Sequence, residues 1–133
     1  MNWSLIRPHL YLGDFNDADN WSLARLCVLE GPPSYSGGRR ATDFHVPILT
    51  SQSGPPASPQ QLDVAAECIN DCLVKELVLL VHCGAGVERS PLTVAWWLRR
   101  TGQHPTLAAA YEELIRLRPV AQDRRAWLPE EFR

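Results

Sequence analysis

The segment VLLVHCGAGVERSP, residues 78–91, is the most informative stretch of this chain. It joins an apolar run to a cysteine, a short glycine-bearing loop, an arginine and a Ser-Pro pair. The apolar run is typical of a buried strand, and the Ser-Pro pair is typical of the start of a helix. Backbone N–H groups of a tight loop at a helix N-terminus bind anions. The segment therefore predicts an anion-binding loop between a strand and a helix.

Several residues of this loop are suited to a phosphate dianion. The loop and the helix favour the thiolate form of Cys83, which could then act as a nucleophile. Arg89 offers a planar guanidinium that can hold two phosphoryl oxygens, and Gly84 and Gly86 allow close backbone approach. A cysteine after a strand can also be an inert buried side chain. We favour the reactive interpretation because His, Cys, Gly, Arg and Ser all fall within nine consecutive residues.

The pattern His82-Cys83-x-x-Gly86-x-x-Arg89-Ser90 resembles the signature of the cysteine-dependent protein tyrosine phosphatases, specifically their small dual-specificity branch. The resemblance implies a phosphatase that hydrolyses phosphate monoesters of the phosphotyrosine type, with dual specificity left open. Weaker similarity extends over nearly the whole chain, at Leu10–Gly13, Val46–Ile48, Arg118-Pro119 and Trp127-Leu128.

The resemblance also implies a role for each residue of the loop. Cys83 attacks phosphorus to form a phosphocysteine, which water then hydrolyses. Arg89 and the loop amides stabilise the phosphoryl oxygens. The Ser90 hydroxyl bonds the cysteine sulfur, or serves as an ordinary N-cap, while His82 orients the loop. The implied phosphate-binding residues are Gly84, Ala85, Gly86, Val87, Glu88 and Arg89.

The sequence departs from the family pattern at the general acid. Members of the family carry an aspartate on an upstream loop, which protonates the leaving oxygen. Val46–Ile48 aligns that position with Thr50 or Ser51, and neither residue can donate a proton at neutral pH. Other carboxylates are better explained as helix caps or exposed side chains: Asp14, Asp17, Asp19, Asp43, Asp63 and Asp71. A phosphate-binding module with little turnover is therefore the alternative function.

Other classes of function receive less support. Sulfur-transfer enzymes also have cysteine loops that end in arginine, but the spacing and the Arg89-Ser90 pair argue against them. Glu88 adds negative charge to a loop without lysine, which disfavours polyanionic lipid head groups. Cys68 and Cys72 could bind a metal, yet no histidine has partner spacing. We expect neither a metal nor a cofactor.

Length and composition predict one domain spanning residues 1–133. The four cysteines lack the spacing of a disulfide framework, which favours the cytoplasm. A net charge of −2 argues against nucleic acid and anionic membranes as partners. Neither a membrane-spanning run nor a signal-peptide pattern is found. The expected partners are a phosphorylated protein or peptide and phosphate, and the oligomeric state stays open.

The remaining patterns predict an α/β fold of three layers, α/β/α, with a mostly parallel sheet of four to five strands. Strands are expected at residues 6–12, 24–30, 43–48 and 77–81. A short helix or turn is expected at 16–23. Helices are expected from 59 onwards, at 91–101, at 105–118 and from 123, with an interruption at Pro129. A capping box should begin the helix at 59, with Ser58 at N-cap, Pro59 at N1 and Gln61 at N3.

Overall fold

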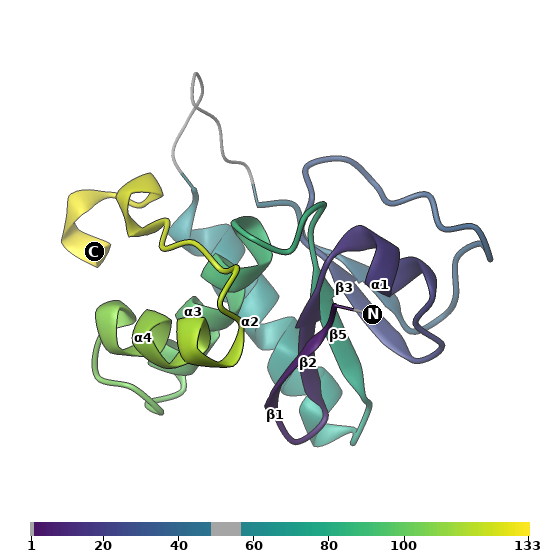
Figure 1. The fold of residues 1–133 in the computed structure, drawn as a ribbon, viewed down its shortest axis with the longest axis horizontal. Helices are drawn as coiled ribbons and strands as arrows, with labels where there is room; N and C mark the ends of the chain where they lie inside the picture. Colours follow the sequence, from purple (N-terminus) through teal and green to yellow (C-terminus); the bar gives the residue numbers. More distant parts are fainter. Residues whose placement is uncertain (1, 49–56) are drawn as a thin grey trace.

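The computed structural model describes residues 2–48 and 57–133 as a sheet with helices on both faces (Figure 1). The elements, in chain order, are β1 (Ser4–Arg7), β2 (Leu10–Gly13), α1 (Phe15–Asp19), β3 (Ala24–Cys27), β4 (Asp43–His45), α2 (Pro59–Val74), β5 (Leu79–His82), α3 (Arg89–Arg100) and α4 (Leu107–Leu117). Two 3₁₀ turns follow, at Arg125–Trp127 and Glu130–Phe132.

The sheet has five strands in the order β1-β2-β5-β3-β4. All neighbouring pairs are parallel except β1 and β2, so the predicted mostly parallel α/β sheet is confirmed. The strand expected at residues 6–12 is wrong, because this stretch is a hairpin of two strands. Pro8 lacks an N–H group for a ladder, and His9 has a φ of 69°, which reverses the chain.

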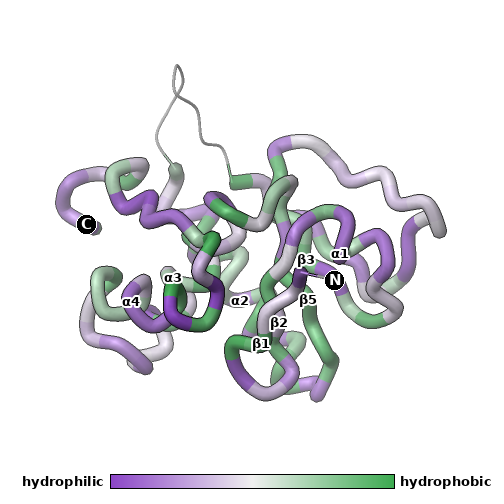
Figure 2. Tube along the Cα trace, viewed as in Figure 1, coloured by the Kyte–Doolittle hydropathy of each residue, from purple (hydrophilic) through white to green (hydrophobic). Residues whose placement is uncertain are grey.

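The two faces of the sheet are covered unequally. Helices α2, α3 and α4 cover one face, with α3 between the other two (Figure 1). The other face is covered by α1 and by the loop that carries Tyr35, which pack on Leu80. Figure 2 shows hydrophobic residues along β3 and β5 and hydrophilic residues along α1 and the outer loops. The strand β5, whose four residues are all buried, therefore lies at the centre of the molecule.

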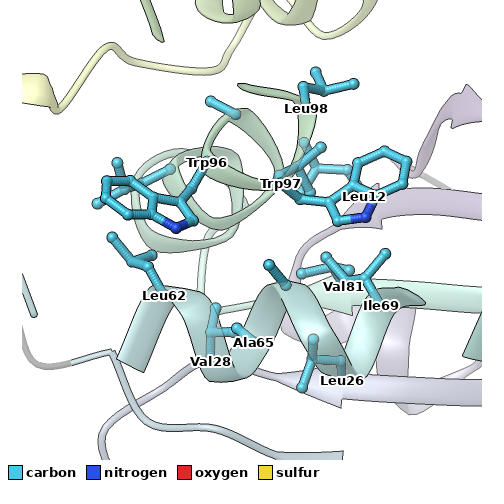
Figure 3. Close-up of a cluster of buried hydrophobic side chains, with 14 of the residues drawn as sticks. Leu12, Leu26, Val28, Leu62, Ala65, Ile69, Val81, Trp96, Trp97 and Leu98 are labelled. Carbon is cyan, nitrogen blue, oxygen red and sulfur yellow. The ribbon is translucent and has the colours of Figure 1, made fainter. Parts of the chain in front are cut away.

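The helix α3 fixes the end of the loop that follows β5. Every residue from Ser90 to Leu98 is buried, as its all-round apolar pattern predicts, although the helix begins at Arg89 rather than Pro91. Trp96 and Trp97 leave α3 on opposite sides (Figure 3). Their indole N–H groups donate to Asp63 and Asn70 of α2, at 2.8 and 2.7 Å. These two bonds join the second half of α3 to α2.

The start of α2 has only one of the two hydrogen bonds of the predicted capping box. Ser58 is the N-cap, and its hydroxyl accepts from the backbone N–H of Gln61 at 3.4 Å. The Gln61 side chain does not complete the box but donates to the carbonyl of Pro47 at 3.4 Å. A complete capping box instead begins α1, between Asp14 and Asp17.

Candidate active site

Cys83 lies immediately after β5, at the carboxyl end of the central strand. Its side chain is 3% exposed, and its Sγ lies 3.2 Å from the Oγ of Ser90. Ser90 is fully buried as the second residue of α3. The N-cap of α3 is Glu88, so the expectation of Ser90 as an N-cap is wrong. The structure thus brings the sulfur and the hydroxyl predicted from sequence into contact.

Gly86 occupies a position in the loop that other residues cannot take without strain. Its φ is 69°, and a Cβ there would lie 2.7 Å from the carbonyl oxygen of Gly13 and 2.6 Å from Nη2 of Arg118. Real Cβ atoms do not approach other atoms so closely. The glycine lets the loop pack directly against the end of β2.

Arg118, at the end of α4, binds the loop residue Gly86, a contact that the sequence did not reveal. It is 3% exposed, and its Nε donates to the carbonyl of Gly86 at 2.9 Å. Its Nη1 donates to Ser4 Oγ at 3.2 Å and to the carbonyls of Asn2 and Leu12. Burial lowers the pKa of Arg118 from its usual value, and nearby carboxylates oppose this shift. The only signal in the sequence was the Arg118-Pro119 pair.

Two further bonds fix the loop from outside. The N–H of Phe15 in α1 donates to the carbonyl of Gly84, and the N–H of Gln122 donates to the carbonyl of Val87, each at 2.8 Å. In a trans peptide the C=O and the following N–H point in opposite directions. Outward carbonyls at Gly84, Gly86 and Val87 therefore turn the N–H groups of the next residues to the other side of the loop. These are Ala85, Val87 and Glu88.

His82 lies on the opposite face of the sheet from the sulfur. Its Nε2 is 2.6 Å from the hydroxyl of Tyr35, and its Nδ1 is 3.1 Å from the carbonyl of Cys83. Burial lowers the pKa of His82 to about 4, so the ring is neutral at pH 7. Because a carbonyl only accepts, Nδ1 is the donor and Nε2 accepts from Tyr35.

Tyr35 is itself fixed by a buried ion pair that sequence reasoning missed. The guanidinium of Arg25 lies 3.5 Å from the centre of the Tyr35 ring. The same guanidinium holds both carboxylate oxygens of Asp43 at 2.7 Å. A continuous set of contacts thus runs from β4 through the 31–40 loop to the backbone of Cys83.

The arrangement of strand, loop and helix has counterparts among solved structures. No protein-family model and no curated protein sequence matches the chain. A variant of human DUSP28 superimposes with a TM-score of 0.77 at 19% identity, covering 96% of this chain and 89% of that chain. DUSP15 gives a TM-score of 0.76 at 22% identity, over 96% and 83% of the two chains.

A mouse putative dual specificity phosphatase complexed with zinc tungstate gives a TM-score of 0.76 at 18% identity, over 95% and 81% of the two chains. The chain has the dual-specificity phosphatase fold. In this fold the segment predicted from sequence as the anion-binding loop lies where β5, α1, α3 and the end of α4 meet. Among the residues described, no helix is both long and apolar enough to cross a membrane.

Within this phosphatase fold, the predicted positions of the general acid, Thr50 and Ser51, lie outside the described residues. The carboxylates weighed as alternatives have other partners. Asp14 and Asp17 cap α1, and both oxygens of Asp19 accept from Ser36 at 2.7 Å. Asp43 binds Arg25, and Asp63 binds Trp96 and Arg100. Asp71 lies exposed on α2.

Two glutamates contact arginines at or near the loop between β5 and α3. Glu88 accepts from Nε of Arg124 at 2.8 Å. Glu30, which follows β3, has Oε1 3.8 Å from Nη2 of Arg89. Sequence reasoning did not single out Glu30, because nothing local places it near a residue far along the chain.

The cysteines outside the loop form no metal centre in the described part of the chain, where no three or more His, Cys, Asp or Glu side chains gather. Cys68 and Cys72 are hydrogen-bonded to each other on α2, which raises the pKa of Cys68 and lowers that of Cys72. Burial raises the pKa of Cys27 to about 11. All four cysteines are free.

Proposed function

We propose that this chain hydrolyses phosphate monoesters of the phosphotyrosine type through a phosphocysteine intermediate. The observation that carries the proposal is the contact of 3.2 Å between Cys83 Sγ and Ser90 Oγ at the base of a loop with outward carbonyls. Arg89 stands at the end of that loop, at the start of α3. In the proposed site, the Cys83 nucleophile, the loop amides and the Arg89 guanidinium act together on one phosphoryl group.

The proposed reaction is a double displacement. The Cys83 thiolate attacks phosphorus, the S–P bond forms, and the bond from phosphorus to the leaving oxygen breaks. Water then attacks phosphorus, the S–P bond breaks, and the thiolate returns. Arg89 and the loop amides stabilise the phosphoryl oxygens in both steps. The Ser90 hydroxyl donates to the departing sulfur in the second step.

Two further observations support the proposal. The mouse protein of similar fold was crystallised with zinc tungstate, and tungstate is an oxyanion like phosphate. Free cysteines throughout the chain suit a reducing compartment, for which we propose the cytoplasm. A phosphorylated protein or peptide is the partner that this chemistry requires.

A second function is favoured by one observation. The described aspartates near the loop cap α1 or bind Arg25, so none of them is placed to protonate a leaving group. A loop that binds phosphate without such a donor would act as a phosphate-binding module with little turnover. In that case the wild-type protein would bind a phosphopeptide and release no phosphate.

The test is phosphate release from a phosphotyrosine peptide, a phosphoserine peptide and a phosphoinositide, with Cys83→Ser as the control. We expect release from phosphotyrosine that is lost in Cys83→Ser, while the variant still binds the peptide. Release that is equal in the wild type and Cys83→Ser contradicts the proposal. Binding without release by the wild type supports the module instead.

A further inference from the structure

A phosphatase of this kind needs a proton for its leaving group, and the described aspartates do not supply one. The phenolic oxygen of tyrosine has a pKa of about 10, so its departure as an anion is slow at neutral pH. A proton donor in reach typically accelerates such a step by roughly 10²–10⁴-fold. We propose that Glu30 is this donor, an inference that rests on the proposed function.

The position of Glu30 follows from the sheet. Strands β3 and β5 are parallel neighbours, with Cys27 paired to His82, so their carboxyl ends lie side by side. The chain leaving β3 therefore passes next to the loop that leaves β5. Leu29 confirms this placement, because its Cδ2 lies 3.9 Å from where a Cβ on Gly84 would stand.

The backbone before Glu30 is held in place from β4. A ring nitrogen of His45 lies 2.8 Å from the carbonyl oxygen of Leu29. The Val28 N–H donates to the carbonyl of His82 at 3.0 Å, so the same segment is also bonded to β5. Glu30 is thus carried by a fixed backbone while its side chain extends past the end of the sheet.

The carboxylate of Glu30 lies at the residue that would bind the substrate phosphate. Its Oε1 is 3.8 Å from Nη2 of Arg89, a separation too long for a direct hydrogen bond. The Glu30 side chain is 49% exposed, so the pair is a weak surface ion pair. Glu88, by contrast, is engaged at 2.8 Å by Arg124. Glu30 can therefore give up its contact when a phosphate arrives.

Substrate binding would prepare Glu30 for its role. A phosphate dianion on Arg89 takes the place of the Glu30 carboxylate beside the guanidinium and brings phosphoryl oxygens close to Glu30. As the S–P bond to Cys83 forms and the P–O bond breaks, the carboxyl proton passes to the leaving oxygen. The resulting carboxylate then takes a proton from the attacking water, which restores the acid.

The test compares Glu30→Gln with the wild type on two substrates, a phosphotyrosine peptide and 4-nitrophenyl phosphate. Nitrophenolate delocalises its charge and leaves with little help, whereas the tyrosine phenolate needs the proton. We expect Glu30→Gln to lower kcat about 100-fold on the phosphotyrosine peptide. On 4-nitrophenyl phosphate the same variant should lower kcat only about tenfold. Glu112→Gln, an exposed glutamate on α4, is the control and should behave as the wild type.

The failures of the two proposals are distinguishable. A wild type that releases nitrophenol in a Cys83-dependent way, with Glu30→Gln changing both substrates equally or neither, overturns the role of Glu30 alone. A wild type that turns over neither substrate overturns the proposed function and the role of Glu30 with it. Vanadate inhibition of Glu30→Gln at wild-type concentrations would show that the loop itself is unchanged.

Discussion

The side chain of Arg118 donates a hydrogen bond of 2.9 Å to the carbonyl of Gly86, 32 residues earlier in the chain. The bond joins the end of α4 to the middle of the loop between β5 and α3. Since Arg118 is buried and also binds the backbone of Asn2 and Leu12, it holds three segments in one arrangement. The shape of the loop therefore depends on a residue that lies far from the loop in the sequence.

Arg118→Lys should weaken both stability and turnover. A lysine ammonium is a point charge on a flexible chain and cannot reproduce the planar set of donors. Buried carbonyls would lose their partners, at a cost of about 2–3 kcal/mol in the free energy of unfolding. Urea unfolding and phosphate release measure the two effects. Arg116→Lys, at an exposed position of the same helix, should change neither quantity.

Gly86→Ala should be more harmful than the same change at Gly102. Both glycines have positive φ values, 69° and 78°, but only at Gly86 would a Cβ meet backbone atoms. The left-handed conformation alone costs about 1 kcal/mol. Overpacking against Gly13 should add about 2 kcal/mol at Gly86. Equal unfolding free energies for the two variants would contradict the close contact.

Ser90→Ala should slow the second chemical step more than the first. The hydroxyl lies 3.2 Å from the sulfur that would depart when the proposed phosphocysteine is hydrolysed. Without it, the phosphoenzyme should accumulate and steady-state turnover should fall by about tenfold, the equivalent of one hydrogen bond. Rapid-mixing kinetics with 4-nitrophenyl phosphate should then show a burst of nitrophenol. Thr101→Ala, at the other end of α3, should give no burst.

The buried His82 predicts a loss of stability in mild acid. Its pKa is lowered from 6.5 to about 4 by burial, so the unfolded chain binds a proton more readily than the folded one. The contribution of His82 to the free energy of unfolding is fully present above pH 6.5. It falls by up to about 3 kcal/mol as the pH drops towards 4. Urea unfolding between pH 7 and 4.5 measures the effect. A His82→Asn variant should show a flatter dependence, and an equally steep one would contradict this assignment.

The lowered pKa of Glu113 leads us to expect a further loss of stability at lower pH. Hydrogen bonds from Arg7, and then from His104, lower the pKa of Glu113 from 4.5 to about 2. Its contribution is present above pH 4.5 and is lost as the pH falls towards 2. Glu113→Gln should therefore remove stability at pH 6 but have little effect near pH 2. Unfolding curves at the two pH values test this, with Glu112→Gln as the exposed control.

Local patterns predicted the parts of the fold that local physics determines. The unbroken apolar run before His82 predicted the central strand β5. The apolar residues on all sides of the segment after Ser90 predicted the buried helix α3. The segment 78–91 also predicted the loop between them, because an apolar strand, a cysteine, glycines and an arginine follow one another directly in the chain. The hairpin at Pro8-His9 was missed because each of its two strands has only four residues, too few for a clear strand pattern.

The supports of the site could not be predicted, since each joins residues distant in the chain. Tyr35 meets His82 across 47 positions, and Arg25 meets Asp43 across 18. An arginine in a strand or a tyrosine in a glycine-rich loop carries no local sign of its partner. Glu30 was missed for the same reason, because its contact with Arg89 exists only once β3 and β5 lie side by side.

The contact between Gly13 and Gly86 links two motifs that the sequence presents as separate. A side chain at Gly86 would strike the backbone of Gly13, and a side chain at Gly13 would strike Asp17, the residue that caps α1. A side chain at Gly86 would force the end of β2 to move, whereas a side chain at Gly13 would displace Asp17 and Leu80. The conformation of the loop at Gly86 and the path of the chain from β2 into α1 are therefore mutually dependent, and a larger residue at Gly86 could be tolerated only if the end of β2 moved away.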